Sequence, residues 1–218
     1  MDGSLCRIGV FYDGSYFACA QNHFYADRNL GWLGFHPFHA LIDTFAREWE
    51  QGFTNYRIVC ATWHQGLFSS SQADERQLRN DRNKHLDLIH AGIEPKLIPM
   101  SQSQGEKGVD VALAIEALQA ALSGTIDLAI LVTGDGDFVP LARALMRRGV
   151  RVGVVYFHYE MGTAKAFANE RLLSAANYSL DVNSLENERR HQGLFRGLFA
   201  NGYKSAPAEK LPKVVTAA

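Results

Sequence analysis

The sequence predicts an α/β fold in which helices cover both faces of a mainly parallel sheet of five or six strands. Short apolar runs rich in β-branched residues alternate with longer segments whose apolar residues recur at helical spacing. Such alternation is typical of parallel sheets, because each parallel strand needs a crossover connection, usually a helix. With 218 residues, 47% of them hydrophobic, the chain can bury one full core and carry an appendage.

The strands are predicted from apolar runs that end at turn residues or polar residues. The first run ends at Asp13, and the central run passes through Thr133 into two aspartates. Pro95 interrupts the third run, which favours an edge position for that strand. The five predicted strands are 6–12, 56–62, 93–98, 126–132 and 150–157.

The helices are predicted from apolar spacing together with start and stop signals. Pro37 near the start and Gly52 beyond the end bound the first of them. The aromatic segment between Phe17 and Phe38 is too irregular for a helix or a strand, and we interpret it as a loop or lid that packs under itself. The predicted helices are 37–49, 71–91, 109–122, one that starts at Phe138, and 163–176.

The character of the chain changes after Asp181. We predict one domain over 1–182, followed over 183–218 by an amphipathic helix and a disordered tail. The amphipathic helix favours a homodimer, and its arginines are candidates for contacts with RNA or a partner. These arginines are Arg189, Arg190 and Arg196.

Charge and cysteine usage exclude several classes of protein. The net charge of -1 provides no long-range positive field, so a nucleic-acid partner would have to be contacted by a local basic patch. The three cysteines are scattered and lack Cys-x-x-Cys spacing, which argues against a disulfide framework and a zinc knuckle. We expect a cytoplasmic protein without membrane partners, because no leader and no apolar run of membrane-spanning length is evident.

Four carboxylates are predicted to converge at the carboxyl edge of the sheet, where α/β proteins bind ligands. They are Asp13 after the first strand, Asp110 at a helix start, and Asp135 and Asp137 after the central strand. Hard oxygen ligands of this kind suit Mg²⁺ or Mn²⁺, since no cysteine or paired histidine accompanies them. At such a site the cation activates water for attack on a phosphodiester.

An alternative explanation is open for two of these aspartates. Asp137 could cap the helix that starts at Phe138, and Asp110 could complement the dipole of its own helix, each worth about 1 kcal/mol. Capping does not explain the whole set, because it needs one acid per helix and here a second acid lies two residues away.

Several motifs lie around these aspartates in a fixed order. They are Asp13-Gly-Ser, Lys107-Gly-Val-Asp110-Val, Thr133-Gly-Asp135-Gly-Asp137-Phe-Val-Pro140 and Gly149-Val-Arg-Val. Together they resemble the NYN domains, in the LabA-like branch of the PIN-like nuclease superfamily, over Arg7 to about Val182. The resemblance implies a PIN-like, Rossmann-like α/β/α fold of three layers and metal-dependent cleavage of RNA, with all four aspartates at the family's acidic positions.

On this basis the sequence predicts a Mg²⁺- or Mn²⁺-dependent endonuclease that hydrolyses phosphodiester bonds of single-stranded or structured RNA. The four aspartates are the predicted catalytic residues and metal ligands. Ser15 and Thr133 are expected to assist through their hydroxyl groups, and Gly134 is a further substrate-binding candidate. Lys107 could neutralise the scissile phosphate, although a solvated loop lysine is an equally good interpretation.

Three positions depart from the family pattern. Tyr16 stands where the family has asparagine, Thr133 stands where serine is common, and Asn177 occupies the late acidic position before an aromatic residue. A second hypothesis is therefore a catalytically weak or inactive NYN module with a nucleic-acid-binding or regulatory role. A phosphatase with an acidic site is the third, and it is weaker because no second aspartate follows Asp13 by two residues.

Overall fold

A six-stranded parallel sheet forms the centre of the protein, as the sequence predicts. The computed structural model describes residues 4–68, 74–100, 107–161 and 164–199. Strand order is β3-β2-β1-β4-β5-β8, every neighbouring pair is parallel, and a separate antiparallel hairpin joins β6 to β7. The strands are β1 (Leu5–Asp13), β2 (Asn55–Phe68), β3 (Glu94–Met100), β4 (Leu128–Val132), β5 (Arg151–Tyr156), β6 (Tyr159–Met161), β7 (Ala164–Ala166) and β8 (Tyr178–Asp181).

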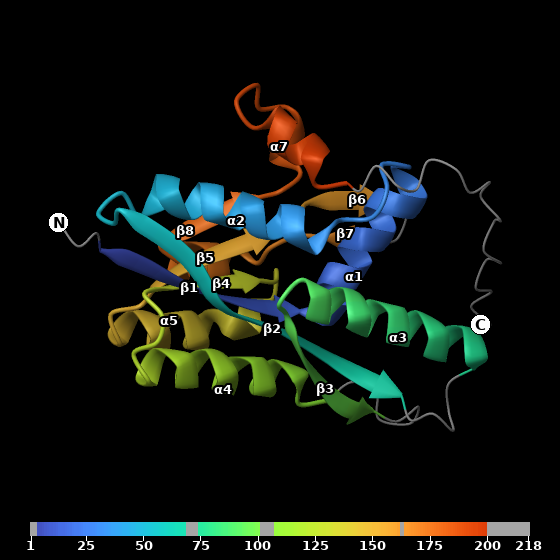
Figure 1. Ribbon diagram of the computed structural model, residues 1–218, viewed down its shortest axis with the longest axis horizontal. Helices are drawn as coiled ribbons and strands as arrows, with labels where there is room; N and C mark the ends of the chain where they lie inside the picture. The colour runs from blue at the N-terminus through green and yellow to red at the C-terminus, as the bar shows by residue number, and fades with distance from the viewer. Residues whose placement is uncertain (1–3, 69–73, 101–106, 162–163, 200–218) are drawn as a thin grey trace.

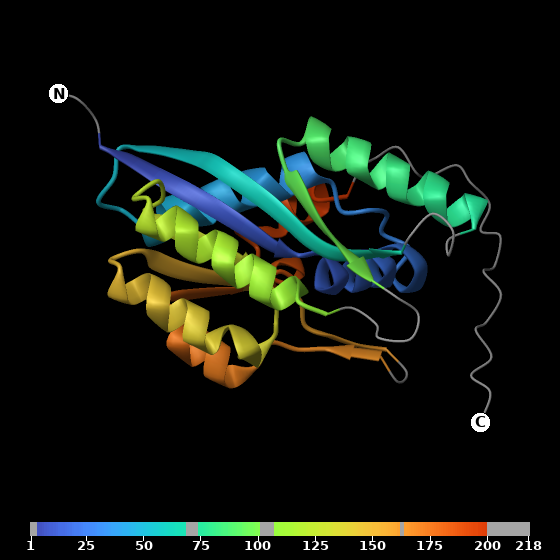
Figure 2. The same ribbon diagram turned by 90° about the horizontal axis from the view of Figure 1, so that it is seen from below.

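Helices lie on both faces of the sheet, which gives the predicted three layers. Figure 1 shows α2 above the sheet and α4 and α5 below it, and Figure 2 shows α6, in orange, beside α5. The elements are α1 (Gly14–Asn22), the π-helix η1 (His23–Asp27), α2 (Phe35–Trp49), α3 (Glu75–His90), α4 (Val109–Leu122), the short 3-10 helices η2 (Gly136–Phe138) and η3 (Ser184–Glu186), α5 (Val139–Arg147), α6 (Glu170–Ala175) and α7 (Gln192–Gly197).

Alternation along the strands separates two cores. Tyr12 belongs to the core under α1 and α2, whereas the adjacent Phe11 belongs to the core over α4 and α5, because successive side chains of a strand point to opposite faces. On α4 the buried residues Leu113, Ala117 and Ala121 recur every four residues. The small side chains of Ala117 and Ala121 let this helix pack closely against the sheet.

The strand order creates a switch point between β1 and β4. From β1 the chain builds outward through β2 to β3, and it then crosses under the sheet through α4 to begin β4 on the other side of β1. Crevices at such points, beyond the carboxyl ends of the strands, are where open α/β sheets bind ligands. The register pairs Tyr12 with Val132, so Asp13 and Thr133 leave the sheet side by side.

The predicted loop between Phe17 and Phe38 is wrong over its first half. Helix α1 starts directly after β1 and continues into η1. A helix forms here because the Asp13 carboxylate accepts the backbone N–H of Tyr16, three residues on, and so caps α1. Phe17 and Phe24 are fully buried, which confirms that these aromatic side chains pack within the protein.

The helix predicted over 163–176 is also wrong in its first half. The chain forms the hairpin strand β7 there, and α6 begins only at Glu170, after Asn169 caps it. Strand β3 lies at the sheet edge, as Pro95 predicts, and β2 continues six residues beyond its predicted end to pair with it.

The C-terminal segment folds back onto the main core. Phe195 and Leu198 of the α7 region are buried, and Phe195 contacts Phe24 edge to face with ring centroids 6.1 Å apart. Residues 200–218 lie outside the described residues, so the disordered tail stays a prediction. The domain boundary at 182 also stays a prediction. None of the described helices is both long enough and apolar enough to span a membrane.

Candidate active site

The acidic edge starts where β1 and β4 end. Thr133 is fully buried, and its hydroxyl donates a hydrogen bond of 3.2 Å to Asp13 Oδ2. The other oxygen of this carboxylate, Oδ1, accepts the backbone N–H of Tyr16 at 3.0 Å. These two bonds, one from each side of the switch point, set the orientation of the half-buried Asp13 carboxylate.

Asp135 and Asp137 extend this edge through a hydrogen-bonded turn. The backbone N–H of Asp135 donates to Thr133 Oγ1 at 3.2 Å, and the backbone N–H of Asp137 donates to Asp135 Oδ1 at 2.9 Å. Both aspartate side chains are exposed. Phe138 is the N-cap residue of α5, with no side-chain capping bond, so the alternative that Asp137 caps this helix is wrong.

Asp110 lies in the first turn of α4. Gly108 is the N-cap of that helix with a φ of 81°, a left-handed conformation that glycine adopts readily, and no side chain caps the helix. The exposed Asp110 carboxylate is therefore placed where the dipole of α4 stabilises a negative charge, as the alternative explanation expects. Lys107, just before it, is also exposed.

Comparison with known proteins identifies the family. The model of the NYN domain matches residues 7–183. The chain belongs to the NYN domain family. Membership places it in the PIN-like nuclease superfamily and confirms the resemblance to NYN domains, whereas the LabA-like branch stays a prediction.

The chain is also similar in sequence to a curated protein. A protein of Methanocaldococcus jannaschii, described only as uncharacterized, is 31% identical over 108 residues, which cover 49% of this chain. The matched region spans 42% of the length of that relative. No solved structure matches the chain significantly.

NYN and other PIN-like nucleases generally use divalent metals, and the donors at this edge are chemically suited to one. They are carboxylate and hydroxyl oxygens, the ligands that Mg²⁺ and Mn²⁺ prefer. Within the described residues, no group of three or more acidic, histidine or cysteine side chains lies close enough to hold an ion. Mg²⁺ is usually held by one or two carboxylates and several waters, so the donors fit such an ion without a larger cluster.

Gly134 has a steric role at the edge of this NYN domain. A Cβ atom there would collide with the backbone carbonyl of Phe167 and would approach the hydroxyl of Tyr16 at 3.0 Å. The absence of a side chain therefore lets the segment that follows the β6-β7 hairpin pack against the turn. Ser15, another predicted substrate contact, is half-buried in α1.

Tyr16, the first departure from the family pattern, is engaged inside the protein. Its hydroxyl accepts the Phe157 N–H at 2.9 Å and lies 3.2 Å from the Phe157 carbonyl, to which it donates. Burial raises the pKa of this hydroxyl well above its usual range, so it stays protonated as a donor. Tyr16 thus ties α1 to the end of β5.

Asn177, the last departure, lies at the opposite end of the sheet. Its side-chain oxygen accepts the backbone N–H of Val152, near the start of β5, at 2.9 Å. The acid at the carboxyl end of β8 is instead Asp181, whose pKa is raised by burial. Sequence reasoning missed Asp181, although a short apolar strand that ends in aspartate is the same signal that identified Asp13.

Sequence reasoning also missed Asn169. Its backbone N–H donates to the Gly134 carbonyl at 2.8 Å, and its side chain accepts the Arg171 N–H at 2.9 Å. A Cβ atom on Gly136 would lie only 2.5 Å from Asn169 Nδ2. The signal was present, because asparagine followed by glutamate before an apolar run is an N-cap pattern.

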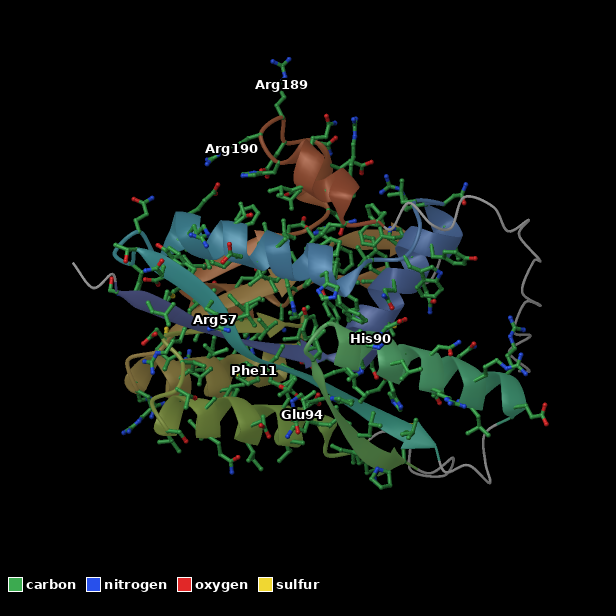
Figure 3. All side chains as sticks on the ribbon, viewed as in Figure 1. Phe11, Arg57, His90, Glu94, Arg189 and Arg190 are labelled. Carbon is green, nitrogen blue, oxygen red and sulfur yellow. The ribbon has the colours of Figure 1, made fainter. Side chains whose placement is uncertain are left out.

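The arginines singled out near the C-terminus lie away from the acidic edge. Figure 3 shows Arg189 and Arg190 projecting outward from the segment before α7, on the face covered by α2. Arg190 forms an ion pair of 2.7 Å with Glu48, so part of its charge is compensated.

Proposed function

We propose that this chain is a LabA-like NYN ribonuclease that hydrolyses RNA phosphodiester bonds with Mg²⁺ or Mn²⁺. The observation that carries the proposal is the hydrogen-bonded series from Asp13 through Thr133 to Asp135 and Asp137 across the switch point. Asp13 and Asp135 also cap the short helices that follow them, but capping does not account for the Thr133 hydroxyl, which joins the two aspartate-bearing segments at a ligand-binding edge.

The protein groups have separate roles in this proposal. Asp13, Asp110, Asp135 and Asp137 are the proposed ligands: one or two of them would hold the cation directly and the others through its bound waters, and the cation would lower the pKa of water and stabilise charge on the phosphate. Thr133 fixes the Asp13 carboxylate, whose second oxygen is fixed by the Tyr16 N–H. The N–H of Asp137 likewise orients the Asp135 carboxylate. Ser15 and Lys107 are proposed to contact the phosphate.

The test is cleavage of a fluorescent RNA in Mn²⁺, Mg²⁺ or EDTA. We expect cleavage to require a divalent cation and to fall at least about 100-fold in Asp135→Asn, because an electrostatic group of the active site is lost. Asp87→Asn, which neutralises an exposed carboxylate on α3, is the matched control and should cleave normally. Cutting in EDTA, or full activity of Asp135→Asn, would contradict the mechanism.

A nucleic-acid-binding module without catalysis is the second candidate function. It is favoured by Tyr16 and Asn177, which depart from the family pattern and are engaged in hydrogen bonds within the protein. Calorimetric titration with Mn²⁺ separates the two functions. Binding that is lost in Asp135→Asn supports the nuclease, whereas no heat at millimolar Mn²⁺ supports the binding module.

Endonucleolytic cleavage and a homodimer are part of the proposal as well. A circular RNA has no ends, so its cleavage would demonstrate an endonuclease. Light scattering during gel filtration measures the oligomeric state directly.

A further inference from the structure

A pocket of about 660 Å³ adjoins the acidic edge. It lies between the start of α5 and α6, two helices that pack side by side on the same face of the sheet (Figure 2). Its volume is within the range of sites that bind small ligands. Asp137 forms part of the pocket wall, so the pocket begins where the acidic turn ends.

Two arginine side chains place positive charge in the wall of this pocket. Arg143 from α5 and Arg171 from α6 line it, and neither forms an ion pair within the described residues. Arginines elsewhere, such as Arg7 and Arg28, are engaged by carboxylates at 2.7 and 2.9 Å. Glu170 also lines the pocket, and no ion pair joins it to either arginine in the part of the chain that the structure describes.

The remaining wall is suited to a nucleotide. Val139, Pro140 and Ala175 provide apolar surface, and Ser174 adds a hydroxyl group. A guanidinium group binds phosphate oxygens through paired N–H donors, and an unpaired base or ribose can lie on apolar surface. A base pair within a duplex would not enter a pocket of this size, because its partner strand would have to enter with it.

We propose that this pocket binds a phosphodiester and its nucleoside from an unpaired RNA strand, next to the phosphate at the acidic edge. The proposal rests on the proposed function, since it names the substrate as single-stranded RNA held on the α5 and α6 side. Arg143 and Arg171 contact the phosphate, and the apolar wall contacts the nucleoside.

The test measures binding of a labelled single-stranded RNA by fluorescence anisotropy in EDTA, where no cleavage occurs. We expect the double variant Arg143→Gln/Arg171→Gln to bind about tenfold more weakly. The dependence of log Kd on log salt should become shallower by about 0.7 for each lost phosphate contact. Arg143→Lys keeps the charge and should recover part of the affinity lost in Arg143→Gln.

Arg147→Gln is the matched control, because Arg147 lies one turn farther along the same exposed face of α5 and outside the pocket. It should bind RNA within about twofold of the parent protein. Equal binding by the double variant and this control would overturn the proposal, as would tighter binding of a duplex than of the single strand. Thermal unfolding of each variant checks that the fold is intact.

The outcomes also separate this proposal from the proposed function. If the parent protein cleaves RNA but the double variant binds and cleaves as the control does, the pocket proposal alone fails. If the parent protein does not cleave, yet its RNA binding in EDTA depends on Arg143 and Arg171, the nuclease proposal alone fails. A parent protein that binds no RNA overturns both.

Discussion

At the scale of single residues, Thr133 is the junction of the candidate site. It is fully buried, donates to the carboxylate at the end of β1, and accepts a backbone N–H from the acidic turn. One hydroxyl group therefore links two chain segments that lie 120 residues apart. Serine, common at this position in the family, would supply the same hydroxyl.

Two replacements of Thr133 measure separately what its hydroxyl group and its methyl group contribute to stability. We expect Thr133→Val to lower the free energy of unfolding by about 1–3 kcal/mol, because the Asp135 N–H and the Asp13 carboxylate lose a partner. Thr133→Ser keeps both bonds and should cost only about 1 kcal/mol for the lost methyl. Urea unfolding measures both, and equal losses would contradict the role assigned to the hydroxyl group.

At the scale of elements, α6 and the acidic turn are held together by Asn169. This residue caps the six-residue helix α6 and hydrogen-bonds to the Gly134 carbonyl through its backbone. Such a short helix gains little from its own hydrogen bonds, so its position depends on the cap and on the packing of Leu172.

Loss of the cap tests this dependence. Asn169→Ala should lower the free energy of unfolding by about 1 kcal/mol and increase amide hydrogen exchange within α6. Asn169→Asp keeps an oxygen that accepts the Arg171 N–H, so it should retain most of the stability. If both variants exchanged equally fast, the side-chain cap would not be what holds α6.

At the scale of the whole molecule, two histidines, the half-buried His39 and the buried His64, couple stability to pH. Burial lowers the pKa of His39 and of His64 from 6.5 to about 4, and the Coulomb effects of His36 and Lys96 add to it. His39 Nε2 and His64 Nδ1 are buried, with no hydrogen-bond partner within the described residues. Both rings are therefore neutral in the folded protein near pH 7.

The stability depends on pH because the pKa of each histidine is about 4 in the folded protein and 6.5 in the unfolded chain. Between pH 6.5 and 4 the unfolded chain binds more protons than the folded one, so stability is fully present above pH 6.5 and is lost as the pH falls toward 4. By pH 5 the loss is on the order of 2 kcal/mol for each histidine. Urea unfolding at pH 7.5 and 5 measures it, and His39→Leu should show a smaller difference between the two pH values than the parent protein.

The sequence predicts the elements well where the signal is local. Apolar runs and helical spacing located all the main strands but β8, the helices α2 to α5 and the edge position of β3, because backbone propensity and burial act over a few residues. For α1 a local signal was present but was interpreted as a turn, because Asp13 caps the helix through the N–H of Tyr16, only three residues away. The β6-β7 hairpin was missed, and the approach of the Phe167 carbonyl to Gly134 joins groups that the sequence alone does not bring together.

For the candidate site, the sequence by itself determined that Asp13 ends a strand and that Asp135 and Asp137 follow another. Only the tertiary structure decided that β1 and β4 are neighbours, since strand order does not follow from the order of elements in the chain. The same neighbour relation places the Thr133 hydroxyl against Asp13. The packing of α6 against α5 likewise puts Arg143 and Arg171 around one pocket, because residues far apart in sequence become a site only through contacts between elements.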